Sequence, residues 1–364
     1  RQSIASSDVR AVLRTLQSDF LTQGPAVAAF ESAIAKRCRA QYAVAVGNGT
    51  EALHLAYLVA GIGAGDEVIT TPNTFVATTN MLLAVGATPV FCDIRLDTYN
   101  IDESKIEALI TPKTKAIVPV HFGGVPCAMD KILAIAQAHK LLVIEDGCHA
   151  LGARYGKTRI GAISDITVFS FHAVKPITTG EGGMLLTNNK SFYERALLLR
   201  SHGITKDTNG FNVMTELGYN YRITDMQCAL GLSQLKRLDA FLKKRHDVAL
   251  WYREAFHCVS QIILPTELGG LYSGWHLYMI RVDDARHRLP LYQYLRAAGI
   301  GVNLHYPAVY SHPYYRAHGF RDVQLPNADL YSATAITLPI HPSLTRADVR
   351  LIAVAIRNFF ISSS

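Results

Sequence analysis

The strongest constraint on the fold is an alternation between two kinds of segment from about residue 43 to about residue 200. Short apolar runs, typical of buried strands, are separated by segments whose apolar residues recur every three or four positions, as in amphipathic helices. We expect strands at residues 42–46, 66–72, 88–94, 115–122 and 141–147, and helices at 50–62, 77–87, 101–110 and 129–140. Strands that alternate with helices predict βαβ units, and therefore an α/β fold with a mostly parallel sheet covered on both faces.

The rest of the chain first continues this pattern and then changes in texture. Residues 165–171 and 182–188 are further strand candidates, and residues 191–203 and 224–256 have helical periodicity. Beyond about residue 258, strands at 275–282 and 336–340 combine with helices at 289–300 and 346–360. We predict a large domain with an N-terminal arm over residues 1–240, and a smaller C-terminal α/β domain over residues 241–364 that includes the linking helix.

Composition excludes several classes of protein. Apolar residues make up 49% of the chain and charged residues 18%, which is typical of a folded globular protein. The net charge of +7 comes from basic residues spread among acidic ones, so no nucleic-acid partner is indicated. No apolar stretch is long enough to predict a membrane span, and the first ten residues lack the apolar core of a secretory signal. None of the six cysteines forms a C-x-x-C pair, so we expect no metal site or disulfide framework, but reduced thiols in a cytoplasmic protein.

Three polar features follow predicted strands, where ligands of open α/β sheets bind. Gly49 and Thr50 lie in "GNGTE", which could be a phosphate cup or a purely structural turn. Asp146 ends "LLVIED" and is either the partner of a buried cation or a helix cap, and nearby His149 alone could be a core residue. Lys175 follows "ITVFSFHAV" and is either a surface lysine or a reactive amine in a pocket.

Taken together, these features are the set that pyridoxal phosphate requires. The turn would hold the cofactor phosphate, and Asp146 would keep the pyridine nitrogen protonated, so that the ring withdraws electrons. Lys175 would join the cofactor aldehyde as a Schiff base and move the proton. Phe75, in "TPNTFVAT", is placed to stack on the ring, although it could also be a core aromatic.

Longer motifs resemble one family. "TPNTFVATTN", "VIEDGCHALGARY", "SDITVFSFHAVKPITTGEGGMLLTN" and "LGYNYRITDMQCALGLSQL" resemble the DegT/DnrJ/EryC1/StrS sugar aminotransferases, and the resemblance extends from about residue 2 to residue 355. Within that family the chain resembles most the UDP-4-amino-4,6-dideoxy-N-acetyl-L-altrosamine transaminases of pseudaminic acid biosynthesis. The resemblance implies a fold-type I, pyridoxal phosphate-dependent transferase.

The resemblance also implies roles for individual residues. Lys175, Asp146 and His149 match the catalytic positions, and Asn220 matches a residue that reaches the cofactor phosphate from the neighbouring subunit of a homodimer. Arg222, which could instead form a structural salt bridge, would lie near the substrate entrance. The implied cofactor contacts are Gly49, Thr50, Phe75, Asp146, His149, Ser170, Lys175 and Asn220, and the implied substrate contacts are Arg222, His305 and Tyr306.

The implied reaction moves an amino group from L-glutamate to C4 of a UDP-linked 4-keto-6-deoxy amino sugar. Four stretches depart from the usual pattern: "GNGT", "HAVK" in place of "HPVK", residues 303–316, which lack part of the pattern, and a short loop between Ile204 and Leu217. A dTDP- or GDP-linked sugar is therefore the alternative substrate. A dehydratase of this family would have His in place of Lys175, and a non-catalytic regulator would not need the complete set of Lys175, Asp146 and phosphate turn.

Overall fold

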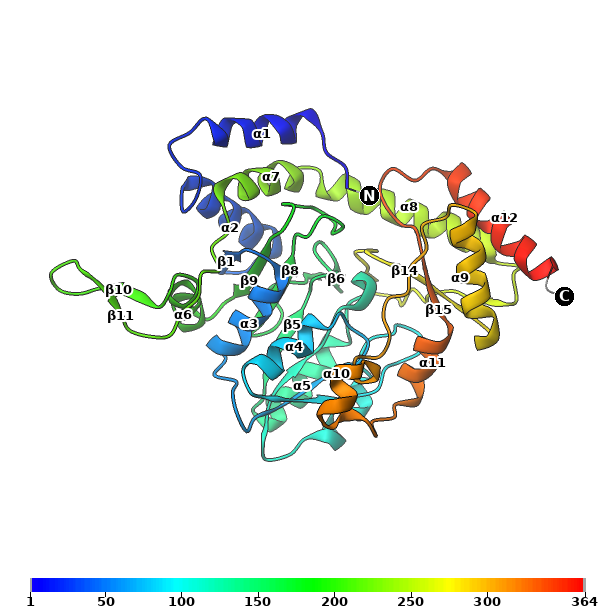
Figure 1. Cartoon of the computed structure of the whole chain (residues 1–364), viewed down its shortest axis with the longest axis horizontal. Coiled ribbons are helices and arrows are strands. Elements are labelled where there is room, and N and C mark those ends of the chain that lie inside the picture. Colours follow the sequence, from blue (N-terminus) through cyan, green and yellow to red (C-terminus); the bar gives the residue numbers. More distant parts are fainter. Residues whose placement is uncertain (1, 363–364) are drawn as a thin grey trace.

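Seven strands form the central sheet in the computed structural model, which describes residues 2–362. Their order is β1–β9–β8–β5–β4–β2–β3 (Figure 1). β9 runs antiparallel to both of its neighbours, and the other neighbouring pairs are parallel. The predicted α/β class with a mostly parallel sheet is confirmed. The strands are β1 (Tyr42–Val46), β2 (Glu67–Thr70), β3 (Thr88–Phe91), β4 (Thr114–Val118), β5 (Leu142–Asp146), β8 (Ile166–Ser170) and β9 (Gly183–Thr187).

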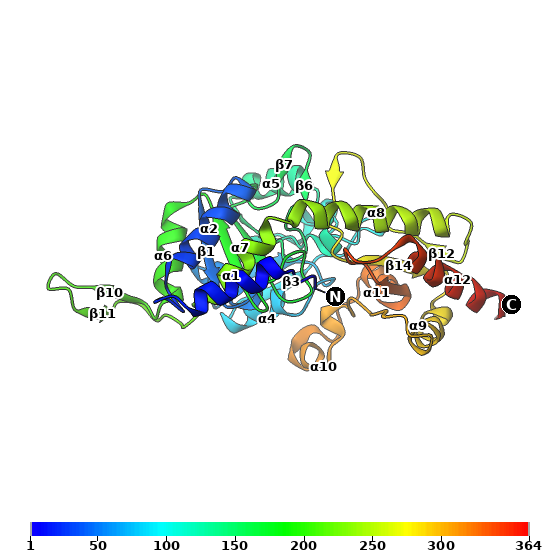
Figure 2. The same cartoon turned by 90° about the horizontal axis from the view of Figure 1, so that it is seen from above.

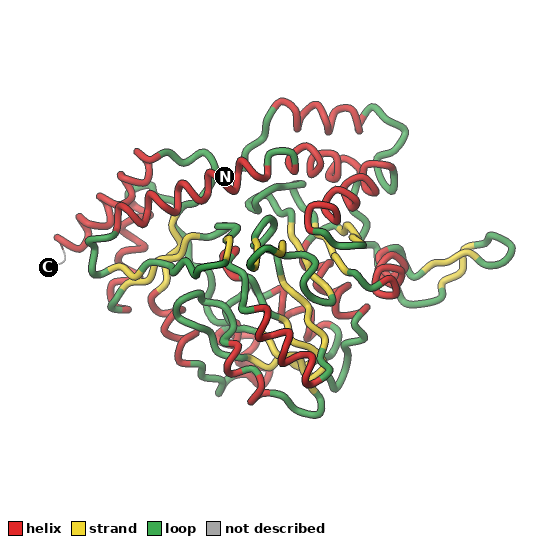
Figure 3. Tube along the Cα trace, turned by 180° about the vertical axis from the view of Figure 1, so that it is seen from behind, coloured by secondary structure: helices red, strands yellow, loops and turns green. Residues whose placement is uncertain are grey.

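Helices cover both faces of this sheet, because alternate side chains of its strands are apolar on both sides. In β1, Val44 packs in one buried cluster with Leu55, whereas Ala43 packs in another with Ile34. The helices on the first face are α3 (Gly49–Val59), α4 (Ala77–Ala84) and α6 (Lys190–Arg200). Those on the second face are α2 (Pro25–Cys38), α5 (Met129–His139) and α7 (Asp225–Leu235). Figure 3 shows the strands lying between the two sets of helices.

The N-terminal segment forms α1 (Ser6–Leu16), which lies along α7 (Figure 1). Asp8 fixes this contact: its carboxylate is buried, accepts a hydrogen bond of 2.8 Å from the Gln234 amide, and pairs with the Arg237 guanidinium. A buried carboxylate needs such donors, since removing it from water unpaired is costly. The charged contact therefore ties the start of the chain to the junction between α7 and the next helix.

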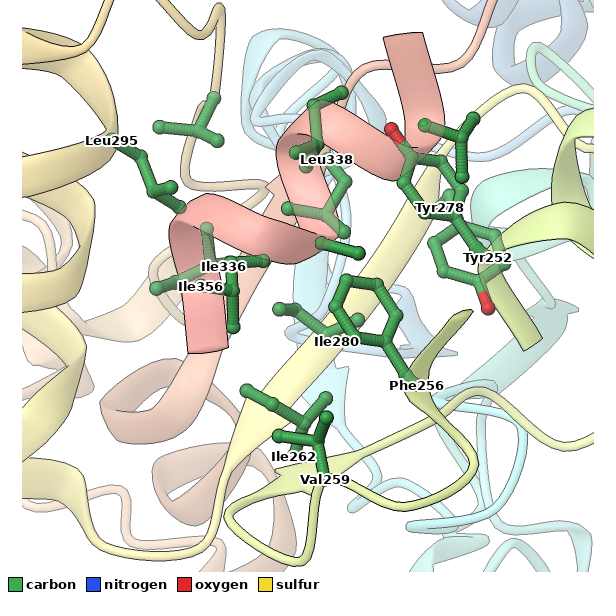
Figure 4. Packing of buried hydrophobic residues seen from close by; sticks show 14 of the residues in the cluster. Tyr252, Phe256, Val259, Ile262, Tyr278, Ile280, Leu295, Ile336, Leu338 and Ile356 are labelled. Atoms are coloured by element: carbon green, nitrogen blue, oxygen red, sulfur yellow. The ribbon is translucent and has the colours of Figure 1, made fainter. Parts of the chain in front are cut away.

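A second apolar core lies in the C-terminal part of the chain (Figure 4). Three antiparallel strands, β12 (Ile262–Ile263), β14 (Tyr278–Val282) and β15 (Ala335–Leu338), pack with helices α8 (Leu238–Phe256), α9 (Arg288–Ala297) and α12 (Arg346–Ser362). Tyr252, Tyr278 and Ile356 are almost completely buried there. A separate cluster joins Phe122 of the large part to Tyr331 of the C-terminal part. The division near residue 240 stays a prediction.

Smaller elements surround these cores. β10 (Ile204–Lys206) and β11 (Asn212–Met214) form a hairpin that extends away from the body of the molecule (Figures 1 and 2). The others are β6 (Arg154–Tyr155), β7 (Thr158–Arg159) and β13 (Leu271–Tyr272), which form one small sheet, and helices α10 (Pro313–Tyr315) and α11 (Pro326–Thr334). None of the helices within residues 2–362 combines the length and the apolar character required to cross a bilayer.

Two predicted helices differ from the structure. Residues 101–110 form two short 3₁₀ turns, because Glu103 turns inward to bind Arg95 and Lys131 and Pro112 disfavours helix just beyond. The segment 224–256 forms two helices, α7 and α8, rather than one. The break falls at residues 236–237, where the Arg237 side chain is held by α1.

Candidate active site

A cavity of about 1330 Å³ lies where β5, β8 and the start of α3 meet the C-terminal part of the chain. Its position at the carboxyl ends of parallel strands is the expected ligand site of an open α/β sheet. Nine of the predicted site residues line it: Gly49, Thr50, Phe75, Asp146, His149, Ser170, Lys175, His305 and Tyr306. The structure thus brings together side chains from positions 49 to 306 around one space.

The phosphate turn is formed by the start of α3. Asn48 caps this helix by accepting a 2.9 Å hydrogen bond from the Glu51 N–H. The first N–H groups of a helix have no acceptor within it and favour an anion. Gly49 leaves the necessary room, since a Cβ there would lie 3.0 Å from the Cβ of Ser170. Gly49, Thr50 and the Ser170 hydroxyl therefore form a cradle that suits a phosphate.

Asp146, the last residue of β5, is only 5% exposed. Its carboxylate accepts hydrogen bonds from the Thr78 hydroxyl at 2.7 Å and the Cys148 N–H at 3.1 Å. Residues 147–153 form turns and not a helix, so the alternative of a helix cap is wrong. No cationic side chain within residues 2–362 pairs with this buried carboxylate, which makes it a suitable partner for a protonated ring nitrogen.

Lys175 lies in the turn that follows β8, where its N–H donates to the His172 carbonyl at 2.9 Å. The residue is half-buried and its side chain lines the cavity, so the alternative of a surface lysine is wrong. Burial lowers the pKa of Lys175, while the neighbouring Cys148 and Asp146 act in the opposite direction. A lowered pKa increases the fraction of neutral amine, which is the form that attacks an aldehyde and accepts a proton.

Three imidazoles surround the amine. His149 is 4% exposed, and its ring lies 4.5 Å from that of His276, between centroids. Burial, reinforced by the charge of Lys175, lowers the pKa of both His149 and His276 well below the usual value. Burial also lowers the pKa of His305 to about 4. At neutral pH all three rings are therefore uncharged and add no further positive charge beside the lysine.

This cluster predicts a pH dependence of stability. Unfolded imidazoles protonate near pH 6.5, whereas these folded ones stay neutral, so the unfolded state binds more protons as the pH falls. The free energy of unfolding should therefore decrease between about pH 7.5 and pH 5.5, by about 1 kcal/mol for each buried ring. His276→Asn should make this pH dependence shallower by that amount. Urea unfolding of the cofactor-free wild type and of the variant, at pH 7.5 and pH 5.5, measures this change in the free energy of unfolding. An equal change in the two proteins would contradict the prediction.

Phe75 and Tyr306, the two predicted site residues with a phenyl or phenol ring, have different environments. Phe75 is 55% exposed, so it is not a core aromatic, and its ring lies 5.9 Å from that of Tyr306. Tyr306 is half-buried, and its ring also lies nearly parallel to the His149 ring. The exposed face of Phe75 is available to a planar ligand; its stacking role stays a prediction.

Asn220 and Arg222 are not brought into this cavity. The strand-like segment that carries them runs beside the end of β1. Arg222 forms an antiparallel β-bridge with Val46, and the Gly47 N–H donates a hydrogen bond of 3.1 Å to the Tyr221 carbonyl. Asn220 is exposed, and Arg222 forms no ion pair with any residue of the described chain. The alternative of a structural salt bridge for Arg222 therefore has no support.

Two lining residues were missed by the sequence analysis. Both reach the cavity from the C-terminal part: His276 lies two residues before β14, and Arg245 lies in the middle of α8. A histidine next to an apolar strand and an arginine in a charged helix carry no distinguishing pattern. The helical spacing of α8, with Phe241 and Val248 on its buried face, does place Arg245 on that face, and this was the one available signal.

The residues present fit pyridoxal phosphate. The α3 cradle matches a phosphate, the Asp146 carboxylate matches a pyridinium nitrogen, and the Lys175 amine matches an aldehyde. The unpaired Nδ1 atoms of His149 and His276, buried in the wall, are further polar groups that a ligand could satisfy. The arrangement can therefore hold this cofactor and move a proton beside it.

Comparison with known proteins agrees with this chemistry. The profile of the DegT/DnrJ/EryC1/StrS aminotransferase family matches residues 2–357. The spore coat polysaccharide biosynthesis protein SpsC of Bacillus subtilis is 42% identical, over 98% of this chain and 95% of its own. Helicobacter pylori PseC, an aminotransferase involved in pseudaminic acid biosynthesis, has a TM-score of 0.95 and 35% identity, over 99% of this chain and 98% of that one.

A second similar structure carries the cofactor in its pyridoxamine form. A putative sugar aminotransferase of Streptococcus pneumoniae, Spr1654, solved in its pyridoxamine phosphate form, has a TM-score of 0.95 and 31% identity, over 99% of this chain and 98% of that chain. The fold is therefore that of the fold-type I transferases, with pyridoxal phosphate as cofactor. The chain belongs to the DegT/DnrJ/EryC1/StrS aminotransferase family and is a pyridoxal phosphate-dependent sugar aminotransferase.

Proposed function

We propose that this enzyme moves an amino group from L-glutamate to C4 of a UDP-linked 4-keto-6-deoxy-N-acetylhexosamine, in the biosynthesis of pseudaminic acid. The observation that carries this proposal is the likeness to Helicobacter pylori PseC over 99% of the chain. The cavity supports it, because this space of about 1330 Å³ extends from Lys175 to Leu344 and Ile352 of the C-terminal part. That space exceeds what a cofactor alone would fill and suits a large nucleotide sugar.

Each group in the cavity has a role in this reaction. When bound, pyridoxal phosphate supplies an electron sink and carries the amino group between donor and acceptor. The Lys175 Nζ, whose pKa is lowered by burial, takes the proton from the donor Cα and returns one to sugar C4. The Asp146 carboxylate holds the proton on the ring nitrogen. Gly49, Thr50 and Ser170 bind the phosphate, while His305 and Tyr306 contact the nucleotide sugar.

A second candidate is an aminotransferase that acts on another nucleotide sugar, such as a dTDP- or GDP-linked 4-keto-6-deoxy sugar. It is favoured by the 42% identity to Bacillus subtilis SpsC, which exceeds the identity to PseC. It is also favoured by the departures at residues 303–316, which include the proposed sugar contacts His305 and Tyr306. A non-catalytic regulator is not supported, since Lys175, Asp146 and the phosphate turn are all in place.

A panel of nucleotide sugars tests the substrate. The purified holoenzyme, first converted to its amino form with L-glutamate, is mixed with UDP-, dTDP- and GDP-linked 4-keto-6-deoxy sugars. The return of the cofactor absorbance is then measured for each. The proposal expects the UDP-linked N-acetylated sugar to have the highest kcat/KM. A higher value for a dTDP- or GDP-linked sugar would transfer the proposal to the second candidate.

We also propose that the enzyme is a homodimer whose active sites are shared. Asn220 is exposed beside the phosphate turn but absent from the cavity of its own chain, as expected for a residue that serves the partner. Exposed apolar side chains support a contact between copies. They include Val9, Leu13 and Leu16 along one face of α1, and Phe211 and Met214 on the extended hairpin (Figure 2). The proposed location is the cytoplasm.

A complementation experiment tests the shared site. Lys175→Ala and Asn220→Ala should each impair the enzyme as pure dimers, whereas a mixture should regain activity. With random exchange, half of the dimers are mixed, and each of these holds one site with neither defect, so about a quarter of all sites become intact. Activity is measured before and after the two variants are unfolded and refolded together. If Asn220 served its own chain, the mixture would gain nothing.

A further inference from the structure

Glu145 and His121 form a buried pair directly behind Asp146. Glu145 precedes Asp146 in β5, and because successive side chains of a strand alternate, the two carboxylates point to opposite faces of the sheet. The side chains of Glu145 and His121 are completely buried, and the His121 Nε2 lies 2.6 Å from a Glu145 carboxylate oxygen. Neither side chain lines the cavity, so this pair does not touch a ligand bound there.

Hydrogen bonds fix both members of the pair. The His121 Nδ1 accepts from the Cys127 N–H at 3.1 Å, so Nε2 carries the ring proton and donates it to Glu145. The other Glu145 oxygen accepts from the Ser164 hydroxyl at 2.6 Å and the Thr167 hydroxyl at 3.0 Å. Burial alone would raise the pKa of Glu145, but these hydrogen bonds hold that pKa below its ordinary value. An ionised carboxylate is thus buried in β5.

Stability alone does not account for such a pair. Moving an ionised carboxylate out of water is costly, and an apolar pair of similar volume is often at least as stable. No lysine or arginine among residues 2–362 pairs with Glu145, and the nearby thiols of Cys38 and Cys127 stay neutral because burial raises the pKa of each. The position of the loop that carries His121 indicates another role.

The loop of residues 119–124 joins Asp146 to the C-terminal part of the chain. At one end, the His121 N–H donates to the Asp146 carbonyl at 3.1 Å. At the other end, the Gly123 carbonyl accepts from the His276 N–H at 2.8 Å. Asp146 and His276 both line the cavity, so this one short loop sets the position of the first relative to the second.

The loop is also packed closely against the segment of His149. Gly124 has a φ of +97°, and a Cβ atom there would lie 2.9 Å from both the His149 carbonyl oxygen and the Trp275 nitrogen. The backbone of the loop therefore contacts the segments that carry two of the three imidazoles of the cavity. A displacement of the His121 ring would move these segments relative to Asp146.

We propose that Glu145 and His121 are positioning residues, which hold Asp146 at a fixed place relative to the wall of His149 and His276. Glu145 is joined to His121 through the side chains, and Asp146 is joined to the same residue through the backbone. Two neighbouring residues of β5 thus hold one loop residue. The pair fixes the carboxylate that is proposed to meet the ring nitrogen of the cofactor. This inference does not depend on which sugar is the substrate.

The absorbance of the cofactor joined to Lys175, followed against pH in the holoenzyme without substrate, tests the proposal. A proton on the ring nitrogen adds a positive charge, which favours loss of the proton from the nitrogen that joins the cofactor to Lys175. If Asp146 is displaced, the ring nitrogen holds its proton less firmly. The pH midpoint of the absorbance change should then rise by about one unit, the usual effect of moving a neighbouring charge.

The double variant Glu145→Met, His121→Leu should show this rise and remain folded. It replaces the polar pair with apolar side chains of similar size, so no buried charge is left unpaired, but nothing directional holds the loop. Urea unfolding of the cofactor-free protein measures its stability. Should the double variant not fold, His121→Asn replaces it, because the shorter amide cannot join Glu145 to the Cys127 N–H and should raise the midpoint in the same way.

Two further variants separate position from charge and from stability. Glu145→Gln keeps an acceptor for His121, and its amide can donate to the hydroxyls of Ser164 and Thr167, so the midpoint should stay within a few tenths of a unit of wild type, roughly the effect of a distant charge. Ser164→Ala is the matched control, because it removes one hydrogen bond from the same carboxylate without touching the loop, and should leave the midpoint unchanged.

The proposal fails if the double variant or its Asn substitute folds and titrates like wild type, since the pair would then be structural only. It also fails if Glu145→Gln raises the midpoint as much as the double variant does, because the negative charge would then act through space. A rise in Ser164→Ala equal to that of the double variant would assign the effect to a general loss of stability, and would overturn the proposal as well.

Discussion

Lys175→Ala is expected to abolish transamination and the absorbance of the cofactor joined to the protein. The amine of Lys175 lines the cavity beside Asp146 and Cys148, and burial lowers its pKa, which favours the neutral form that acts as nucleophile and base. Because no other lysine among residues 2–362 lines this cavity, none of these side chains can take over both roles. The rate of amino transfer should fall by on the order of 10³-fold or more.

The fold should survive this substitution. The Lys175 side chain has no hydrogen-bond or ion-pair partner within the described chain, so its removal leaves no buried group unsatisfied. Spectra of the purified variant with added pyridoxal phosphate, together with turnover of L-glutamate, measure the effect. Lys157→Ala, which truncates an exposed lysine between β6 and β7, should behave as wild type. A Lys175 variant that still turned over a keto sugar at the wild-type rate would refute the assignment of the amine.

Much of this site could be predicted because it depends on the sheet. Parallel strands end at the same edge, so residues that directly follow predicted strands, such as Asp146 and Lys175, were expected to meet. Periodicity alone was sufficient to place those strand ends. The resemblance to known aminotransferases added Ser170, His305 and Tyr306, which no local pattern distinguishes, and the structure places all three on the cavity.

What could not be predicted depends on contacts between distant segments. Arg245 and His276 enter the wall because α8 and the segment before β14 pack against the large part, and their neighbours in the sequence do not reveal this. Residues 101–110 have helical periodicity but break into turns, since tertiary bonds to Glu103 outweigh a weak local preference. Asn220 could be placed only by resemblance, because its proposed ligand lies in another copy of the chain.

Asp146→Asn should slow the chemical step strongly while leaving the site assembled. The amide oxygen of asparagine can still accept the hydrogen bond from the Cys148 N–H, and its amide nitrogen can donate to the Thr78 hydroxyl, which now bonds Asp146 at 2.7 Å. Only the negative charge is lost. Without it, nothing in the buried wall favours a proton on the ring nitrogen, and the cofactor withdraws electrons less well.

We expect kcat to fall by about 10²-fold or more, with the absorbance of the cofactor joined to Lys175 retained. Single-turnover reaction with L-glutamate measures the proton transfer directly and separates it from binding of the nucleotide sugar. Thr78→Val is a useful companion, because it removes one hydrogen bond to the carboxylate but keeps the charge, and should cost far less. If Asp146→Asn reacted as fast as wild type, the carboxylate would serve only to hold the turn at Cys148, and the electron sink would need another partner.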